Sequence, residues 1–239
     1  MRGIVLAGGK ATRLMPLTKI TSKQLLPVYD KPMIFYPLET LLRAGIKEVL
    51  IIIAPDYAGH FLNLLGSGRE FGEGVTFTYE IQDHPRGLAD AFIIGESFID
   101  DDAVTMILGD NIITDDVSGA IQTFKSGGRI FAKKVSDPER FGVVEFDDKL
   151  HALSIVEKPK RPASDYAVTG LYIYDSRVVN FAKKLSPSPR GEIEITDINN
   201  IFLQRGELDV RILEKPWFDA GTFDSLLAAS QYIADDARR

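Results

Sequence analysis

The sequence predicts a three-layer α/β protein, in which a mixed, mainly parallel sheet lies between helices and gains antiparallel additions in its second half. Two observations carry this prediction. Short apolar runs alternate with segments of helical periodicity through the first half of the chain. Some of these runs, such as Val-Leu-Ile-Ile-Ile-Ala at 49–54, are continuously apolar, as strands buried on both faces should be. Such alternation is typical of parallel strands joined by covering helices.

The first half supplies the parallel strands. A strand is expected at 3–7, and a helix at 34–44 places Leu38, Leu41 and Leu42 on one apolar face. The elements that follow are a strand at 49–54, a helix at 60–65, a strand at 75–82, a helix at 87–98 and a strand at 104–108. Ligands bind beyond the carboxyl ends of such strands, above all where the strand order reverses. The residues after each strand are therefore the first candidates for a site.

The pattern changes after residue 109. A helix at 117–125 and a strand at 129–135 continue the alternation. The later elements are a hairpin of strands at 143–146 and 152–156, a strand at 167–174, a helix at 176–185, a helix that begins near residue 194, a strand at 208–213 and a helix at 223–233. Because no linker, repeat or low-complexity segment interrupts this series, we expect one domain over residues 1–239.

Composition excludes several functions. A net charge of −6 argues against a general binder of nucleic acid or anionic membranes. The absence of cysteine excludes disulfides and cysteine-ligated metals, and His60, His84 and His151 have no metal-ligand spacing. Neither a membrane span of roughly 18 apolar residues nor a signal-peptide pattern occurs. We therefore expect a cytoplasmic protein without nucleic-acid or membrane partners.

The segment LAGGKATRLMPLTK, directly after the first strand, is the first candidate site. Its spacing matches neither the P-loop nor the dinucleotide-binding fingerprint. Gly8 and Gly9 still permit close approach of backbone amides to an anion, and Arg13 can grip a phosphate with two donors. Lys23 adds a point charge further on, whereas Lys10 is expected to face solvent. Alone, the segment fits a phosphate cradle and a plain strand-to-helix turn equally well.

Two aspartates from distant parts of the sequence are candidates for a metal site. Asp110 follows an apolar strand in ILGDN, and Asp219 lies in WFDAGT. Mg²⁺ usually takes one or two carboxylates together with substrate phosphates, so two converging aspartates would suit a nucleoside triphosphate. The alternative for Asp110 is that it caps the next helix.

The pair Glu157 and Lys158 in VEKP is a candidate for contacts with a second substrate. At the end of a strand, neighbouring side chains are expected to point to different sides. Glu157 could then accept hydrogen bonds from sugar hydroxyls while Lys158 contacts a phosphate. Taken alone, the pair fits a solvated surface better.

Together, these motifs have the order and approximate spacing of the sugar-1-phosphate nucleotidyltransferases, which the whole chain resembles. The matching segments are LAGGKATRLMPLTK, KQLLPVYDKPMI, GLADAF, LGDN, FGVVEFD, EKP, YAVTGLYIYD, RGEIEITDIN and WFDAGT. The second segment resembles the thymidylyl members more than the uridylyl members, which usually carry KEMLP. The resemblance implies a short form with a Rossmann-like nucleotidyltransferase fold and a homo-oligomer. It also implies that dTTP and glucose 1-phosphate react, with Mg²⁺ as cofactor, to give dTDP-glucose and pyrophosphate.

The resemblance also implies roles for individual residues. Residues 1–110 would mainly bind the nucleotide, and residues 111–239 mainly the sugar phosphate. The catalytic cations would be Arg13, Lys23 and Lys158, and the Mg²⁺ ligands Asp110 and Asp219. The nucleotide-binding set would be Leu6, Gly8, Gly9, Arg13, Gln82, Gly87 and Leu88. The sugar-phosphate set would be Gly142, Glu157, Lys158, Val168, Tyr172 and Arg190.

The implied reaction agrees with the residue types. A sugar phosphate is already an anion near neutral pH, because the second pKa of a phosphate monoester is about 6. The reaction therefore needs no general base or protein nucleophile, only positioning and charge neutralisation in an in-line transfer. A chain without cysteine but with these cations after its strands fits that requirement.

The nucleotide preference is open to alternatives. The Gln82 amide can accept from N3–H and donate to O4 of thymine, but uracil offers the same edge, so UTP and a uridylyl activity are the alternative. The segment HPRGLADAF also departs from the thymidylyl pattern, because Arg86 replaces a common aspartate and Asp90 a glutamine. An extra cation there could change the preference. A third hypothesis, a non-catalytic sugar-nucleotide sensor, predicts loss of metal or phosphate residues, yet all are present.

Overall fold

The computed structural model describes residues 1–9 and 11–238, so the expectation for Lys10 lies outside the described residues. Its central sheet contains four parallel strands: β1 (Arg2–Ala7), β4 (Glu48–Ile53), β5 (Thr76–Ile81) and β6 (Val104–Leu108). They lie in the order β5-β4-β1-β6. The strand order therefore reverses between β1 and β6, which is where ligands bind in sheets of this type.

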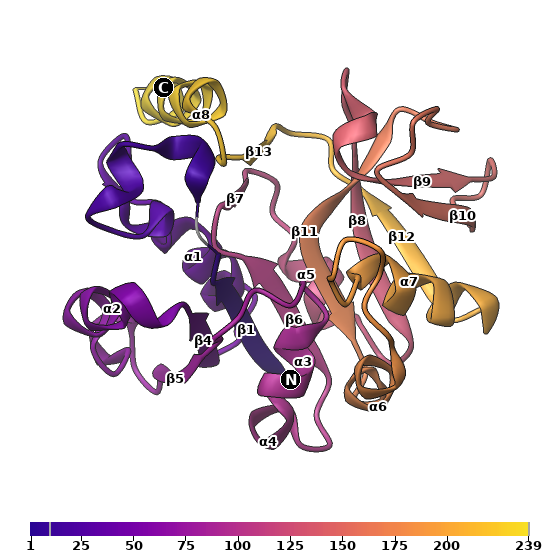
Figure 1. The fold of residues 1–239 in the computed structure, drawn as a ribbon, viewed down its shortest axis with the longest axis horizontal. Coiled ribbons are helices and arrows are strands. Elements are labelled where there is room, and N and C mark those ends of the chain that lie inside the picture. Colours follow the sequence, from indigo (N-terminus) through magenta and orange to yellow (C-terminus); the bar gives the residue numbers. More distant parts are fainter. Residues whose placement is uncertain (10, 239) are drawn as a thin grey trace.

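Antiparallel strands extend the sheet beyond β6 (Figure 1). β11 (Tyr166–Tyr174) pairs with β6, with β8 (Gly128–Lys134) and, at Ala167, with β9 (Gly142–Phe146). β9 forms the predicted hairpin with β10 (Ala152–Glu157), and β12 (Leu208–Ile212) runs parallel to β8. The predicted fold class, with its antiparallel additions in the second half, is confirmed.

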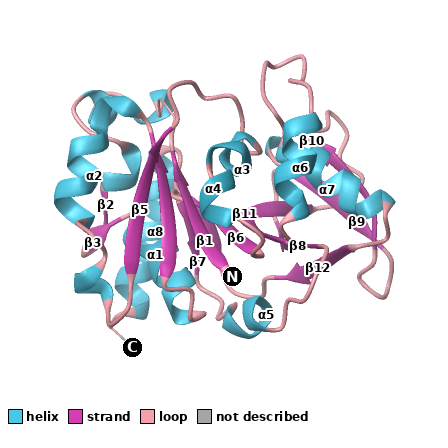
Figure 2. Ribbon diagram, turned by 90° about the horizontal axis from the view of Figure 1, so that it is seen from below, coloured by secondary structure: helices cyan, strands magenta, loops and turns pink. Residues whose placement is uncertain are grey.

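Alternate residues of the strands pack into two apolar cores, one on each face of the sheet. Helices lie on both sides of the sheet (Figure 2). In β1, Ile4 and Leu6 belong to the first core, and Val5 and Ala7 to the second. The first core is covered by α3 (Asp90–Ile94), α4 (Glu96–Ile99), α6 (Arg177–Lys184) and α7 (Ile195–Gln204). The second is covered by α1 (Phe35–Arg43), α2 (Ala58–Leu65) and α5 (Ser118–Gln122).

A third, smaller cluster holds the carboxyl-terminal helix in place. α8 (Phe223–Asp236) packs over β13 (Trp217–Asp219), β7 (Asn111–Ile113), and the short pair β2 (Pro27–Val28) and β3 (Lys31–Pro32). The helix starts with a reciprocal capping box between Thr222 and Ser225. Because β13 pairs with β7, the segment that contains Asp219 lies next to the segment that follows β6.

The helix predicted at 87–98 differs from the structure. It forms two short helices, α3 and α4, that meet at Gly95. A Cβ at this glycine would lie 3.0 Å from the Ala91 carbonyl oxygen and 3.1 Å from the Leu50 side chain. The helix passes so close to the sheet that only glycine fits there without a shift of its neighbours, and the regular helix is interrupted at that point.

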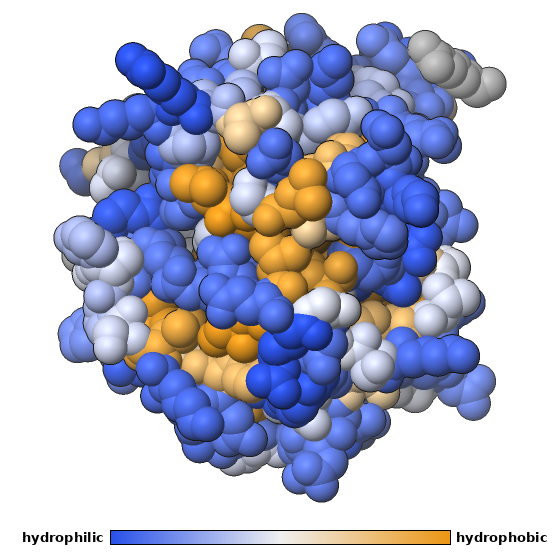
Figure 3. Space-filling model, turned by 90° about the vertical axis from the view of Figure 1, so that its right-hand side faces the viewer, coloured by the Kyte–Doolittle hydropathy of each residue, from blue (hydrophilic) through white to orange (hydrophobic). Residues whose placement is uncertain are grey.

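The surface carries apolar side chains in more than one place. Figure 3, which looks at the right-hand side of Figure 1, shows apolar patches surrounded by hydrophilic residues. On and beside β10, the edge strand of this side, Leu150, Leu153 and Val156 are exposed. Within residues 1–9 and 11–238, no helix has both the length and the apolar composition needed to cross a membrane.

Candidate active site

Two adjoining cavities open at the carboxyl ends of β1 and β6. The larger has a volume of about 620 Å³ and the smaller about 190 Å³. Both are lined by Leu88, Leu108, Asp110 and Glu192, so the two cavities meet at the end of β6. This is the place at which the strand order reverses, as the sequence predicts for a ligand site.

The predicted site residues divide between the two cavities. Of the nucleotide-binding set, Arg13 lines the large cavity, Leu88 borders both, and the small cavity also contains Leu6, Gly8, Gly9, Gln82 and Gly87. Lys23 lines the small cavity as well. The large cavity contains the whole sugar-phosphate set: Gly142, Glu157, Lys158, Val168, Tyr172 and Arg190. The structure therefore brings every predicted residue to one site, and the individual roles stay predictions.

The glycines after β1 bring the backbone close to the wall of the small cavity. A Cβ on Gly8 would lie 2.7 Å from Oε1 of Gln82, so a side chain here would displace the glutamine. Gly9 has a φ of 106° and open space around it, a conformation that other residues rarely adopt. The loop then enters a short 3₁₀ helix (Thr12–Leu14) that carries Arg13. The local fold thus exposes backbone next to an arginine.

The opposite wall of the small cavity is the turn before α3. Gly87 has a φ of 105°, and a Cβ there would lie 2.5 Å from the carbonyl oxygen of Ile193. The same carbonyl accepts a hydrogen bond from the Ala89 N–H at 3.2 Å. Only glycine therefore fits at position 87, because of its positive φ and its contact with Ile193. The hydrogen bond from Ala89 to Ile193 connects this turn to the segment before α7.

Asp110 lies at the border of the cavities, buried after the end of β6. Its carboxylate forms an ion pair with Lys23 and accepts a hydrogen bond from Nδ2 of Asn111 at 3.2 Å. Burial opposes its charge, but the Lys23 charge and these hydrogen bonds outweigh burial and lower the pKa of Asp110. The carboxylate is therefore kept ionised inside the site.

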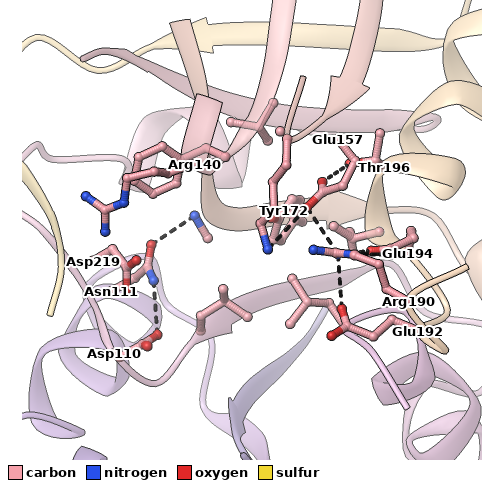
Figure 4. A pocket seen from close by; sticks show the side chains of 18 of the residues that line it. Asp110, Asn111, Arg140, Glu157, Tyr172, Arg190, Glu192, Glu194, Thr196 and Asp219 are labelled. Carbon is pink, nitrogen blue, oxygen red and sulfur yellow. Dashed lines mark hydrogen bonds and ion pairs between the residues drawn. The ribbon is translucent and has the colours of Figure 1, made fainter. Parts of the chain in front are cut away.

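Asn111 holds Asp110 in a fixed orientation (Figure 4). Its Oδ1 accepts from the Gly170 N–H at 2.9 Å and from Nε1 of Trp217 at 2.6 Å. Because both donors occupy the carbonyl end of the amide, the NH₂ group must face the carboxylate. Trp217 lies on β13, so the same strand positions Asn111 and carries Asp219.

Asp219 faces the same cavity as Asp110, and its pKa is raised to about 6 by burial and by the Asp110 charge, against the cations Lys23, Arg13 and Arg140. Mutual repulsion of the two carboxylates, one buried and one partly buried, is the condition that a bound cation would relieve. Both supply hard oxygen donors of the kind that Mg²⁺ prefers. Mg²⁺ is usually held by one or two protein carboxylates together with substrate phosphates. The donor set therefore fits the predicted metal.

In the large cavity, Glu157 at the end of β10 accepts a hydrogen bond from the Thr196 hydroxyl at 2.7 Å. A Cβ on Gly142 would lie 3.3 Å from both Glu157 Oε2 and the Thr196 hydroxyl oxygen. Glycine thus leaves room for the carboxylate to approach the backbone of β9. Tyr172 also lines the large cavity. Its burial, together with the charges of Glu157 and Asp110, raises the pKa of its hydroxyl far above the usual range. The tyrosine stays neutral and can donate a hydrogen bond.

Arg190 is held by carboxylates on the rim of the large cavity (Figure 4). Its Nη2 lies 2.8 Å from Oε2 of Glu194, 3.2 Å from Glu192 and 3.4 Å from Glu157. Burial opposes the charge on Glu194, but hydrogen bonds from Arg190 and Ser188 outweigh it and lower the pKa of Glu194. The guanidinium is therefore oriented before any substrate arrives.

The expectation that Glu157 and Lys158 point to different sides is wrong. Both line the large cavity, and Nζ of Lys158 lies 3.8 Å from Oε1 of Glu157. Lys158 has a φ of 42°, and its N–H donates to the Phe141 carbonyl at 2.9 Å. This left-handed residue ends the strand alternation, so the lysine turns back over the same cavity. The pair is also partly solvated, because 49% of the Lys158 side chain and 25% of the Glu157 side chain are exposed.

Several residues of the site were not among the predicted ones. Arg140 lies in the turn before β9 and faces the large cavity beside Asp219. Its sequence signal is its place directly before the FGVVEFD segment. The other additional lining residues are Gln24, Pro85, Leu108, Asn111, Phe141, Gly170, Glu192, Glu194, Ile195, Thr196 and Trp217. Asn111 could have been found as the neighbour of Asp110, whereas Trp217 and Thr196 reach the site only through tertiary contacts.

Comparison with known proteins agrees with this geometry. The family model described as nucleotidyl transferase matches residues 2–236. A glucose-1-phosphate thymidylyltransferase from Neisseria meningitidis is 52% identical over 98% of this chain and 82% of its own length. One from Mycobacterium tuberculosis is 50% identical over the full chain and 84% of its own length.

Solved structures give the same result. A crystal structure of a Bacillus anthracis protein, described as a glucose-1-phosphate thymidylyltransferase in complex with a sucrose, has a TM-score of 0.92 and 46% identity. It covers 97% of this chain and 94% of its own. A UDP-glucose pyrophosphorylase complexed with UDP-glucose has a TM-score of 0.83 and 26% identity, with 98% of each chain covered. The chain therefore belongs to the nucleotidyl transferase family, in which it resembles the glucose-1-phosphate thymidylyltransferases.

Proposed function

We propose that this protein transfers a thymidylyl group from dTTP to glucose 1-phosphate and releases pyrophosphate. The observation that carries the proposal is the pair of cavities that meet at Asp110. The small one has the glycines and the glutamine amide suited to a nucleotide, and the large one has cations and hydroxyl-binding carboxylates suited to a sugar phosphate. Relatives that bear the name of this activity are about half identical to the chain.

In the proposed reaction an oxygen of the sugar phosphate attacks the α-phosphorus of dTTP. A new P–O bond forms, the bond from the α-phosphorus to the bridging oxygen breaks, and pyrophosphate leaves with the electron pair. The nucleophile needs no base, because a phosphate monoester with a second pKa of about 6 is already ionised at neutral pH. The protein therefore acts through position and charge rather than through a covalent intermediate.

The three cations are expected to contact different phosphate groups. Arg13, which lines the large cavity, would neutralise charge that develops on the leaving pyrophosphate, and Lys158 would hold the phosphate of the sugar next to Glu157. Lys23, now paired with Asp110, is placed to reach a triphosphate at the small cavity. Asp110 and Asp219 would hold Mg²⁺, which supplies charge neutralisation on the phosphates when bound. The cytoplasmic location and the homo-oligomer stay predictions, and light scattering of the purified protein would test the second.

The test is a matrix of nucleoside triphosphates and sugar 1-phosphates, each with and without Mg²⁺, with pyrophosphate release as the readout. We expect the highest kcat/KM for dTTP with glucose 1-phosphate in the presence of Mg²⁺. A uridylyl activity is the second candidate, because uracil and thymine present the same edge to Gln82 and a UDP-glucose pyrophosphorylase shares the fold. A strong preference for UTP would reverse the order, and no turnover in any combination would favour the non-catalytic sensor.

A further inference from the structure

Asp90 is a buried carboxylate one side chain away from the small cavity. It opens α3, and only 1% of its side chain is exposed. One carboxylate oxygen accepts from Nε2 of Gln82 at 3.0 Å, and the other accepts from Nη2 of Arg86 at 2.7 Å. Arg86 and Asp90, the two departures from the thymidylyl pattern, therefore form an ion pair with each other. The cation expected beside the base is engaged by Asp90, while 58% of the Arg86 side chain is exposed.

This arrangement fixes which end of the Gln82 amide faces Asp90. An ionised carboxylate only accepts hydrogen bonds, so it selects the NH₂ end of the amide and repels the carbonyl end. The carbonyl Oε1 is left on the opposite side, next to the loop after β1, where it lies 2.7 Å from the position a Gly8 Cβ would take. A 180° flip of the amide would place Oε1 against a buried negative charge, at the cost of a charge-assisted hydrogen bond.

The fixed orientation has a consequence for the base. A free glutamine can present its oxygen and NH₂ in either order, and the two orders suit different pyrimidines. Thymine offers a donor at N3 and an acceptor at O4, whereas cytosine offers an acceptor at N3 and a donor at N4. For a base held in one position, a glutamine with one fixed orientation matches only one of these patterns. A flipping glutamine matches both.

We propose that Asp90, anchored by Arg86, is a positioning residue that fixes the amide orientation of Gln82 and so makes the nucleotide site discriminate between dTTP and dCTP. The inference rests on the proposed function and adds to it the residue that keeps Gln82 selective. Asp90 itself does not line either cavity, and it acts through Gln82.

The test compares kcat/KM for dTTP and dCTP, with saturating glucose 1-phosphate and Mg²⁺, in the wild type and in Asp90→Asn. The substitution keeps the shape of the side chain but gives it an amide, which can pair with either end of Gln82. We expect the dTTP:dCTP ratio to fall about tenfold or more, chiefly because KM for dCTP falls and KM for dTTP rises. kcat with dTTP should stay within about threefold. The matched control is Asp83→Asn, an exposed aspartate of the same loop, which should keep the wild-type ratio.

A double-mutant cycle separates this mechanism from a general loosening of the loop. In a Gln82→Ala background, Asp90→Asn should leave the ratio unchanged, because the side chain through which it acts is gone. An equal fall in both backgrounds, or an unchanged ratio in the Asp90→Asn single variant, would overturn the proposal. The ratio compares two substrates on one preparation, so a partly unfolded variant does not alter it.

Arg86→Gln provides a second test that leaves residue 90 intact. It removes only the exposed anchor, and we expect a smaller fall of the ratio in the same direction, about threefold. An unchanged ratio would contradict the role of Arg86 as anchor. A wild type that turns over no dTTP would instead contradict the proposed function, so the two failures are distinct.

Discussion

The two cavities present polar groups in different ways. In the small cavity, Asp110 forms an ion pair with Lys23. Asp90, which does not line the cavity but contacts Gln82, forms an ion pair with Arg86. Besides its charged side chains, the small cavity offers a ligand the backbone at the glycines and one oriented amide. The large cavity is lined by many more charged side chains, among them Arg13, Arg140, Lys158, Arg190, Glu157, Glu192 and Glu194.

This difference follows from the two kinds of sheet. The parallel strands deliver short loops at their carboxyl ends, so backbone and strand-end residues form the small cavity. Among the antiparallel strands, β11 places the alternate residues Val168, Gly170 and Tyr172 along the large cavity, and β9 and β10 each contribute one end residue, Gly142 and Glu157. A base is read by fixed hydrogen-bond polarity, whereas a sugar phosphate is held by charge. Substitutions in the two cavities should therefore affect different kinetic constants.

The largest expected effect comes from removal of the metal ion that Asp110, at the border of the two cavities, and Asp219 would hold. Removal of divalent metal with EDTA should lower turnover by about 10³-fold or more, because neither Asp110 nor Asp219 can neutralise phosphate charge without a cation. The measurement is pyrophosphate release in EDTA, followed by excess MgCl₂. Full recovery should follow the addition of MgCl₂. Undiminished turnover in EDTA would show that the two aspartates serve another purpose.

A charge in the large cavity should have the next largest effect. Lys158→Ala should lower kcat by about 10²-fold, because the ammonium lies beside Glu157 where the sugar phosphate is expected to bind. Lys160→Ala removes an exposed lysine two positions away and is the matched control. Steady-state kinetics with both substrates measures the effect. Equal kcat values for the two variants would remove Lys158 from the catalytic set.

A glycine of the small cavity should affect one substrate only. Gly8→Ala places a Cβ 2.7 Å from Oε1 of Gln82, so the amide must shift from its position between Gly8 and Asp90. We expect KM for dTTP to rise about tenfold, with KM for glucose 1-phosphate within about twofold of the wild type.

Glu157→Gln is the counterpart in the other cavity. It removes the charge that accepts from Thr196 and should raise KM for glucose 1-phosphate about tenfold, without a matching change for dTTP. Initial rates over a grid of both substrate concentrations give the two KM values for each variant. If both variants raise both KM values equally, the division of labour between the cavities is wrong.

The sequence predicted the parts of this site that depend on strand ends. Gly8 and Gln82 directly follow β1 and β5, and Asp110 lies two residues after the end of β6. The ends of parallel strands meet at one edge whatever the details of packing. The fold class followed for the same reason, because hydrophobic periodicity reports local structure and strand–helix alternation limits topology.

The remaining features depend on side-chain orientation or on close approach between distant segments. Arg86, which the sequence suggests as an extra cation, forms an ion pair with Asp90. No sequence motif predicts this pair. The positive φ of Lys158 reverses the side on which its ammonium lies. Gly95 interrupts a helix only because that helix touches the sheet. Local pattern cannot supply such facts, since each depends on atoms far away in the sequence.

Gly221 is another residue that depends on close approach between distant segments. Its substitution should have the smallest effect on kcat among the variants compared with Lys158→Ala. A Cβ at this position would lie 3.1 Å from Oδ1 of Asp219 and 3.3 Å from Nη2 of Arg13, so Gly221→Ala should shift both groups by a few tenths of an ångström. Because a misplacement of about 1 Å can cost roughly 10²-fold, a shift of this size should lower kcat about fivefold.

The dependence on metal concentration identifies the cause. If Asp219 ligates Mg²⁺, the Mg²⁺ concentration for half-maximal rate should rise in Gly221→Ala together with the fall in kcat. Gly119→Ala, at a position with open space around it on α5, should change neither value. A lower kcat with an unchanged Mg²⁺ dependence would assign the effect to Arg13 alone. It would also show that Asp219 of β13 does not share the role of Arg13, although both lie beside the same glycine.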